Sequence, residues 1–386
     1  MGFVFVHTAD WQVGRRFRAF EAGLASALED ARLDAIDTLA ATATSSGARH
    51  VLVAGDVFDG EDVPARTLRQ VFERMRQHTS VSWWLLPGNH DPARPNGLWT
   101  RFAAIASPSG GRPSPTANIV TLLDPSPREI EPGVVLLPAP LTARTSPHDP
   151  TAWMDDAVTP AGAMRIGLAH GSIKGFGGDD AANVPIDPQR ARKARLDYLA
   201  LGDWHGTVRI DPRTWYSGTP EPDSFDGNDP GHALIVRMRE AGAEPTVERV
   251  YTARYQWRQI AAKLGKGAGV DAIDRDLAAS DVPLQRQIVK LALTGKVGAE
   301  QFEQVASWRD TLEARLRFLD ADLSRLVVQA PAGDGAALLD GDPVLGPLAA
   351  KLRQMECAAE GAEARAAGVA LQKLLDFDRR SREAAE

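Results

Sequence analysis

The sequence predicts an α/β fold: a four-layer αββα sandwich, followed by a small α+β capping domain and a C-terminal helical tail. Near the N-terminus, short apolar segments alternate with Ala/Leu-rich segments of helical periodicity, which is the pattern of a layered α/β domain. A longer stretch rich in short apolar strands comes next. A glycine-rich segment at residues 263–269 then precedes a second, shorter alternation of helices and strands.

The first sheet and its helices are predicted from the N-terminal alternation. Residues 21–44 and 63–78 have helical periodicity, and residues 3–7, 51–54 and 81–86 are apolar and short enough to be buried strands. Open α/β sheets bind ligands beyond the carboxyl ends of their strands. The loops that follow these strands are therefore expected to carry functional side chains.

The strand-rich part of the chain predicts a second sheet that packs on the first and completes the sandwich. Its expected strands cover residues 119–123, 134–138, 165–169, 198–201, 215–217, 232–238 and 246–251.

Composition also suggests the domain organisation. Residues 1–262 are expected to form the main domain, 263–328 the capping domain, 329–342 a flexible linker rich in Ala, Gly and Asp, and 343–386 one or two helices. Within the capping domain we expect helices at 271–279 and 299–316 and strands at 287–293 and 323–328.

The overall composition is that of a soluble globular protein, with 44% hydrophobic and 25% charged residues. A net charge of −7 and a pI near 5.7 argue against a surface coated in basic charge, but they allow a local basic groove. The single cysteine, Cys357, excludes an internal disulfide and a thiolate metal cage. We find no basic leader and no apolar run of about 18 residues, so we expect no membrane span and a cytoplasmic location.

Five short polar segments, each after an apolar stretch, supply the side chains of a candidate hydrolytic site. They are residues 10–12, 55–56, 88–91, 170–171 and 202–205. Carboxylate, amide and imidazole ligands at strand ends can hold two divalent ions, which clamp a phosphate and acidify a bound water. The candidate ligands are Asp10, Asp56, Asn89, His170, Asp203 and His205. This combination predicts a metal-dependent phosphoesterase.

Two further histidines are assigned different roles. His90 stands beside Asn89, where it could protonate a leaving alkoxide or stabilise the charge of the phosphate. His7 lies inside the first predicted strand, and we expect it to anchor that strand rather than to bind metal.

The chain resembles the calcineurin-like metallophosphoesterases, specifically the SbcD-type DNA repair exonucleases, over about residues 3–330. The likeness rests on the opening segment HTADW at residues 7–11 and on YSGTPEP at residues 216–222, which is similar to a segment that follows the family's last metal motif. Enzymes of this type are the nuclease partners of an SMC-like ATPase in double-strand-break processing. The resemblance therefore implies DNA as substrate and such an ATPase as partner.

The resemblance also implies a role for each site residue. The first metal would be surrounded by Asp10, Gln12, Asp56 and His205, and the second by Asp56, Asn89, His170 and Asp203. Asp56 would be shared by both metals, and His90 would be the catalytic histidine that is not a ligand. A metal-activated water would attack the phosphorus while His90 assists the leaving oxygen.

Two positions depart from the family pattern, because Gln12 and Asp203 stand where the family has histidine. Asp203 remains a competent hard ligand. Gln12 offers a weaker amide oxygen, or it holds a water beside the metal. Both changes replace nitrogen by oxygen, which favours a pair of Mn²⁺ ions, with Mg²⁺ as the alternative. The other interpretation is that the first metal site is weakened or nearly empty.

Arg15, Arg16 and Arg18 follow the first motif closely and are candidate contacts to a phosphodiester backbone, since arginine matches phosphate geometry. They could equally be a solvated loop. The C-terminal segment has amphipathic spacing, which suits docking to the ATPase, packing on its own domain, or pairing with a second copy of the chain.

The predicted function is a metal-dependent DNA exonuclease or endonuclease. One alternative is a phosphodiesterase or phosphatase for a small phosphate ester, although such an enzyme has no need of a cap and tail. The other alternative is a catalytically impaired DNA-binding or scaffold subunit of an ATPase complex, suggested by Gln12 and Asp203.

Overall fold

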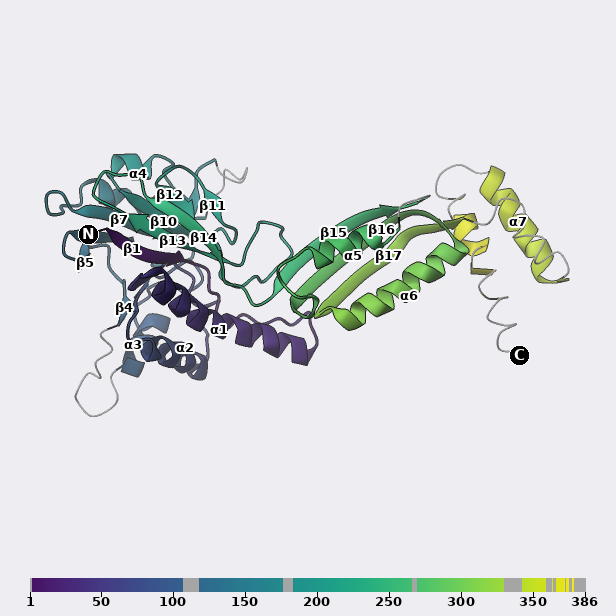
Figure 1. Ribbon diagram of the computed structural model, residues 1–386, viewed down its shortest axis with the longest axis horizontal. Helices are drawn as coiled ribbons and strands as arrows, with labels where there is room; N and C mark the ends of the chain where they lie inside the picture. Colours follow the sequence, from purple (N-terminus) through teal and green to yellow (C-terminus); the bar gives the residue numbers. More distant parts are fainter. Residues whose placement is uncertain are drawn as a thin grey trace. The chain divides into compact units, whose positions relative to one another are not determined.

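The computed structural model describes residues 2–106, 118–175, 183–265, 269–329 and 342–358, with residues 363, 366–371, 373–374 and 377 of the C-terminal segment. The chain divides into two compact units, Met1–Gln256 and Trp257–Glu386. Each unit is described by itself below, and Figure 1 shows their elements.

The first unit contains two six-stranded sheets. The first sheet has the strand order β14-β13-β1-β2-β3-β4, and its strands β1, β2, β3 and β4 run parallel to one another. Its strands are β1 Phe3–Thr8, β2 His50–Val53, β3 Ser82–Leu85, β4 Ile119–Thr121, β13 His232–Met238 and β14 Thr246–Tyr251. Three helices, α1 Ala22–Ser46, α2 Ala65–Gln77 and α3 Leu98–Ala106, supply apolar side chains to the core on one face of this sheet.

The second sheet has the order β11-β12-β10-β7-β6-β5. Its strands are β5 Arg128–Glu131, β6 Val134–Ala139, β7 Met164–His170, β10 Tyr198–Gly202, β11 Val208–Arg209 and β12 Thr214–Tyr216. The central strands β6, β7, β10 and β12 are parallel to one another. The unit also contains a short ladder of β8 Ser172–Ile173 with β9 Pro185–Ile186, a 3₁₀ turn η1 Ala152–Asp155, and the short helix α4 Arg190–Lys193.

The two sheets share one apolar core. Phe5 and Leu52 from the first sheet and Leu168 and Tyr198 from the second are buried in the same cluster. Successive side chains of a strand point to opposite faces of the sheet. Val6 of β1 therefore packs in the core beneath the helices, and β1 is buried on both faces. On the outer face of the second sheet, Met154 of η1 and Ala191 of α4 cover a third cluster. These layers confirm the predicted α/β sandwich.

Three strands that the sequence assigned to the second sheet belong to the first. β13 pairs antiparallel with β1, β14 pairs with β13, and β4 pairs with β3. Their sequences fit either sheet, because apolar alternation reports burial and not the identity of the neighbouring strand. The chain returns to its first strand after completing the second sheet.

The second unit has a three-stranded sheet in the order β15-β16-β17. Its elements are β15 Gln256–Leu264, α5 Asp271–Ala278, the 3₁₀ turn η2 Leu284–Arg286, β16 Gln287–Gly298, α6 Ala299–Arg315 and β17 Phe318–Gln329. The structural division after Gln256 differs from the expected one at residue 262, which falls inside β15. The glycine-rich stretch that suggested a boundary follows β15, and Ile260 and Ala262 already pack against the core of the second unit.

Helix α7, Leu345–Ala358, confirms a helix in the C-terminal segment. The expected linker at 329–342 lies almost entirely outside the described residues. Within the described part of the chain, no helix combines the length and apolar character needed to cross a membrane.

Candidate metal centre

The polar segments predicted from the sequence meet at the carboxyl ends of strands from both sheets. Asp10 follows β1, Asp56 follows β2, and Asn89 follows β3 in the first sheet, while His170 ends β7 and Asp203 follows β10 in the second. Contacts across the sandwich join the two sets. The Nδ1–H of His170 donates to the carbonyl of Ala54 at 2.8 Å, and the backbone N–H of Asp203 lies 3.1 Å from an Asp10 carboxylate oxygen.

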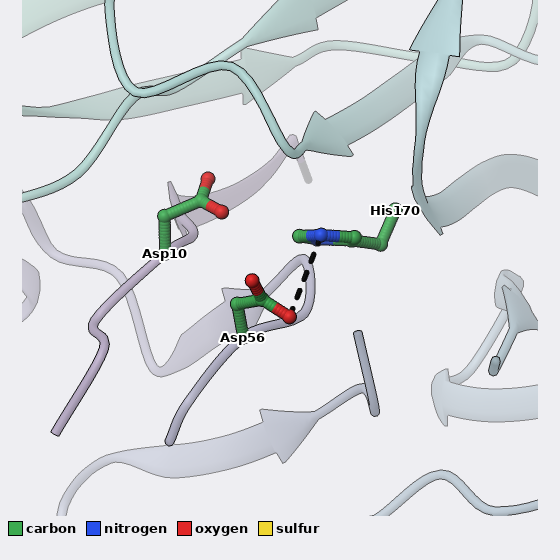
Figure 2. A group of neighbouring side chains, drawn as sticks. All are labelled: Asp10, Asp56 and His170. Atoms are coloured by element: carbon green, nitrogen blue, oxygen red, sulfur yellow. Dashed lines mark ion pairs between the residues drawn. The ribbon is translucent and has the colours of Figure 1, made fainter. Parts of the chain in front are cut away.

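Asp10, Asp56 and His170 form the centre of the site. One possible ligand atom from each lies within 4.8 Å of the other two. Figure 2 shows the three side chains converging from different segments, with an ion pair of 3.5 Å between His170 Nε2 and Asp56 Oδ1. All three are buried, with relative exposures of 0%, 2% and 0%. Such a buried group of carboxylates and an imidazole is the ligand chemistry of a divalent cation.

Close backbone approach is required at this centre. A Cβ at Gly88 would overlap the carboxylate and backbone nitrogen of Asp56, and a Cβ at Gly202 would overlap the carbonyl of Ala54. Asp10 and Asp56 themselves have positive φ angles of 53°, a conformation that non-glycine residues rarely adopt. Strained backbone of this kind concentrates at functional sites. Here the two residues with positive φ are the ones whose carboxylates converge with His170 (Figure 2).

Electrostatics favour a cation in the centre. Burial raises the pKa of Asp10 to about 6, with Asp56 and Asp203 adding to the rise. Burial by itself would lower the pKa of His170, but the carboxylates of Asp56, Asp10 and Asp203 raise it to about 9. The protein thus gathers several carboxylates around buried side chains, and a bound cation would neutralise their negative charge.

The contact between His170 and Asn89 is also suitable for a metal ion. Without a metal, the raised pKa of His170 keeps hydrogens on both ring nitrogens, so Nδ1–H donates to Ala54 and Nε2–H donates to Asn89 Oδ1 at 2.9 Å. A cation that displaces the Nε2 hydrogen would leave two acceptor atoms, Nε2 and Oδ1, facing it. Neighbouring ligands of an octahedral ion with bonds of about 2.1 Å also lie about 3 Å apart. The observed distance is therefore suitable for two ligands of one ion, as expected for Asn89 and His170.

Asp203 also reaches this group, although histidine was expected there. Its Oδ1 lies 3.8 Å from His170 Nε2, and its Oδ2 accepts a 2.5 Å hydrogen bond from the hydroxyl of Ser172. Its φ of 103° is a further left-handed conformation in this loop. The carboxylate is placed beside the other candidate ligands of the second metal.

Gln12 is placed in the site with its amide oriented by Asp56. Its Nε2 donates to Asp56 Oδ2 at 2.9 Å, and the residue is 1% exposed. Its Oε1 is buried with no hydrogen-bond partner among the described residues. A buried acceptor without a partner is costly, so this atom is suited to a ligand such as a metal or a bound water.

The remaining two candidate histidines are each held through Nδ1. His90 Nδ1 lies 3.0 Å from the carbonyl of Asp59, and His205 Nδ1 lies 3.2 Å from Asp223 Oδ1. Because both partners are acceptors, Nδ1 carries a hydrogen in each ring, and Nε2 is not used in these contacts. His90 Nε2 lies 4.0 Å from Asp56 Oδ2, and its side chain is 44% exposed. It can therefore meet a substrate at the rim.

The three arginines differ in position. Arg15 lies beside the site, with Nε 3.4 Å from Asp223 Oδ2 and one guanidinium nitrogen 3.7 Å from Asp59. Arg16 pairs with Glu29 on α1, and Arg18 is exposed. Geometry thus brings only Arg15, among the three, into direct contact with residues that hold the site histidines.

Several supporting residues were not predicted from the sequence. Asp91 accepts hydrogen bonds from the N–H groups of Gly88 and Phe58 and so holds the loop that carries Asn89 and His90. Asp223 and Arg32 form a buried ion pair behind His205. Asp91 belongs to the polar segment 88–91, and Asp223 directly follows the segment 216–222, so both had a usable signal in the sequence. Arg32 lies within helix α1 and belongs to no motif.

Comparison with known proteins places this arrangement in a family. The calcineurin-like phosphoesterase family model matches residues 3–206, from β1 to just past His205. This match covers more than half of the chain, so the protein belongs to the calcineurin-like phosphoesterases, which are hydrolytic enzymes that use divalent metals.

Individual relatives add detail. The chain is 28% identical over 299 residues to the DNA double-strand break repair protein Mre11 of Aeropyrum pernix, an alignment that covers 70% of this chain and 66% of that protein. The chain therefore spans slightly less than two thirds of this relative's length. The solved structure of TT1561 from Thermus thermophilus aligns with a TM-score of 0.40 and 11% identity, over 65% of this chain and 100% of that one.

Proposed function

We propose that this phosphoesterase is a DNA nuclease with a two-metal centre. The observation that carries the proposal is the convergence of Asp10, Asp56 and His170 within 4.8 Å, beside further candidate ligands from both sheets. DNA as the substrate is supported by the similarity to Mre11, a DNA double-strand break repair protein. We assign Asp10, Gln12, Asp56 and His205 to the first metal and Asp56, Asn89, His170 and Asp203 to the second.

The bound metals would neutralise phosphate charge and make an attacking water more acidic. The chain's own residues orient the reaction. Asp56 receives hydrogen bonds from His90 N–H and from Gln12, which fix its two carboxylate oxygens. His90 is held through Nδ1–H by the Asp59 carbonyl. With a second hydrogen on Nε2, as the imidazolium, it can give that proton to the departing oxygen of the scissile bond and return to the neutral ring.

Mn²⁺ is the proposed native ion, with Mg²⁺ as the alternative. In this ligand set oxygen outnumbers nitrogen, because Asp10, Asp56, Asn89 and Asp203 are joined by the amide of Gln12, and carboxylate and carbonyl oxygens suit hard ions. Full dependence on Zn²⁺ without any response to Mn²⁺ would contradict this assignment.

DNA contact is proposed through Arg15, which lies between Asp59 and Asp223 at the edge of the centre. The net charge of −7 opposes tight DNA binding by this chain alone at physiological salt. We therefore also propose an SMC-like ATPase partner that supplies much of the binding affinity for DNA. The similarity to Mre11 supports a place in double-strand break repair.

The test is cleavage of linear double-stranded and single-stranded DNA with Mn²⁺, in parallel with a small aryl phosphodiester. The proposal expects metal-dependent DNA cleavage that His90→Ala strongly reduces. Hydrolysis of the aryl ester without DNA cleavage would instead indicate an enzyme for small phosphate esters. Intact DNA binding without hydrolysis of either substrate would indicate an impaired scaffold subunit.

A further inference from the structure

The histidines of the centre are held in one common way, with one exception. His170 and His90 each direct Nδ1 to a backbone carbonyl, of Ala54 and Asp59 respectively. His205 instead directs Nδ1 to a carboxylate oxygen of Asp223 at 3.2 Å. A carboxylate that accepts a hydrogen bond from one ring nitrogen fixes the tautomer of the imidazole. It also makes the other ring nitrogen more basic and so a stronger metal ligand.

Asp223 is connected in turn to the loop that carries the other first-metal residues. Its Oδ2 lies 3.2 Å from a guanidinium nitrogen of Arg32, and these side chains are 2% and 1% exposed. Another nitrogen of Arg32 donates at 2.7 Å to the carbonyl of Trp11, which stands between Asp10 and Gln12. One buried ion pair therefore joins the two halves of the first metal site.

We infer that Asp223, braced by Arg32, is a positioning residue of the first metal site. It holds His205 with Nε2 toward the metal and strengthens that ligand where Gln12 supplies a weak amide in place of an imidazole. Arg15 Nε, 3.4 Å from Asp223 Oδ2, is a second guanidinium contact to the same carboxylate oxygen. This inference rests on the proposed function, because it takes His205 as a ligand.

The test is calorimetric titration of the metal-free full-length protein with Mn²⁺. The wild type is expected to bind two ions. Asp223→Asn keeps the size of the side chain and removes its charge, and it is expected to weaken one site roughly 10- to 100-fold while leaving the other unchanged. His205→Ala is expected to weaken the same site, and the double variant should lose little more than His205→Ala alone.

A matched control separates positioning from general stability. Asp197 is also a buried carboxylate, 3.2 Å from Arg213 and bonded to backbone N–H groups, but it lies at the opposite end of β10 from Asp203. Asp197→Asn should lower thermal stability and leave both Mn²⁺ affinities unchanged. Equal weakening of both sites by Asp223→Asn would overturn the inference, as would no change at either.

The two proposals fail in different ways. If His205→Ala leaves both sites intact, the ligand assignment of the proposed function is wrong. If His205→Ala removes one site and Asp223→Asn does not alter it, the inference alone is wrong. Ring-nitrogen NMR of wild-type histidines gives a readout that no folding defect can affect. The sample is the protein loaded with Mg²⁺, which is diamagnetic, in place of Mn²⁺. The spectrum should show a hydrogen on Nδ1 of His205 and none on Nε2. A hydrogen on Nε2 would also overturn the inference.

Discussion

At the scale of single residues, Gln12 is the candidate ligand with the largest expected effect on the proposed first metal site. It stands where the resemblance to the SbcD-type enzymes leads us to expect histidine. It is buried, and its amide nitrogen donates to Asp56, the carboxylate that we propose both metals share. A donor on Asp56 competes with metal for the electron density of that oxygen, whereas an imidazole at this position would contribute its own lone pair. Gln12 is therefore expected to be a weak ligand itself and also to lower the affinity of Asp56 for the metal.

Gln12→His is expected to raise the Mn²⁺ affinity of the first site by about tenfold. This is the lower end of the affinity change that follows from replacing a residue around a metal. It should also raise the affinity for Zn²⁺ more than that for Mg²⁺, because nitrogen suits softer ions. Competition titrations with the three ions would measure this. Unchanged affinities would show that Gln12 does not approach the metal.

His90 is predicted to act on the substrate and not on the metal. Its Nε2 is 4.0 Å from Asp56, and its side chain is the most exposed among the site histidines. His90→Ala should lower kcat for DNA cleavage by about 10²- to 10⁴-fold, the contribution of a general acid that protonates the sugar alkoxide. Mn²⁺ stoichiometry should stay the same, and the loss of an ion in this variant would make His90 a ligand.

The candidate ligands could be predicted because each belongs to a short motif after an apolar strand. The residues that hold them could not, since a ring nitrogen is fixed by whichever acceptor the fold brings beside it. For His170 and His90 that acceptor is a backbone carbonyl, which every residue possesses. For His205 it is Asp223, whose partner Arg32 is distant in sequence.

At the scale of elements, β1 and β10 connect the two sheets beneath the metal centre. His7 of β1 accepts a hydrogen bond at Nδ1 from the Tyr198 hydroxyl at 3.0 Å and directs Nε2 to the Leu201 carbonyl at 3.2 Å. The ring is fully buried and neutral, since burial lowers the pKa of His7 to about 3. His7 anchors its strand, as predicted, and aligns the loops that carry Asp10 and Asp203.

This burial makes stability depend on pH. Between pH 6.5 and about 3 the unfolded chain binds a proton at His7 that the folded protein does not, so the free energy of unfolding falls as the pH falls. The slope from this group is about 1.4 kcal/mol per pH unit. Urea unfolding of wild type and His7→Phe at pH 7 and pH 5 should show a smaller pH effect in the variant. Equal effects in both proteins would rule out this role.

Elements with strong apolar patterns were predicted well, but their partners were not. The helices α1 and α2 and the strands of both sheets follow periodicity in the sequence. The return of β13 to pair with β1 depends on contacts more than two hundred residues apart, which periodicity does not encode. β15 was missed because its half-exposed alternation runs directly into the glycine-rich segment that looked like a boundary.

At the scale of the whole molecule, the metal centre belongs entirely to the first unit, and the C-terminal segment has a separate small core. Ala349 and Leu371 are buried there with Leu345, Leu352 and Leu374 around them, so this cluster contains only residues of the segment itself. Exposed Val344, Leu348 and Met355 leave apolar surface on or beside α7. Such exposed apolar side chains are suitable for docking of this segment on the proposed ATPase partner.

Removal of residues 343–386 is therefore expected to leave Mn²⁺ binding and aryl phosphodiester hydrolysis unchanged. The cluster lost is independent of the core around Leu291 and Leu326 in the second unit. Titration and steady-state assays of the truncated protein would test this. A truncated protein that folds but no longer binds metal would show that the segment supports the centre.

The central claim is that side chains from the strand ends of both sheets form one two-metal centre that shares Asp56. The most direct measurement is the Mn²⁺ stoichiometry of the wild type and of Asp56→Asn, determined by equilibrium dialysis with metal analysis. We predict two ions per chain in the wild type and weakened binding of both in the variant, because Asp56 lies beside His170 at 3.5 Å and beside Gln12 at 2.9 Å. A wild type with a single ion, or a variant that keeps one site at full affinity, would contradict the account.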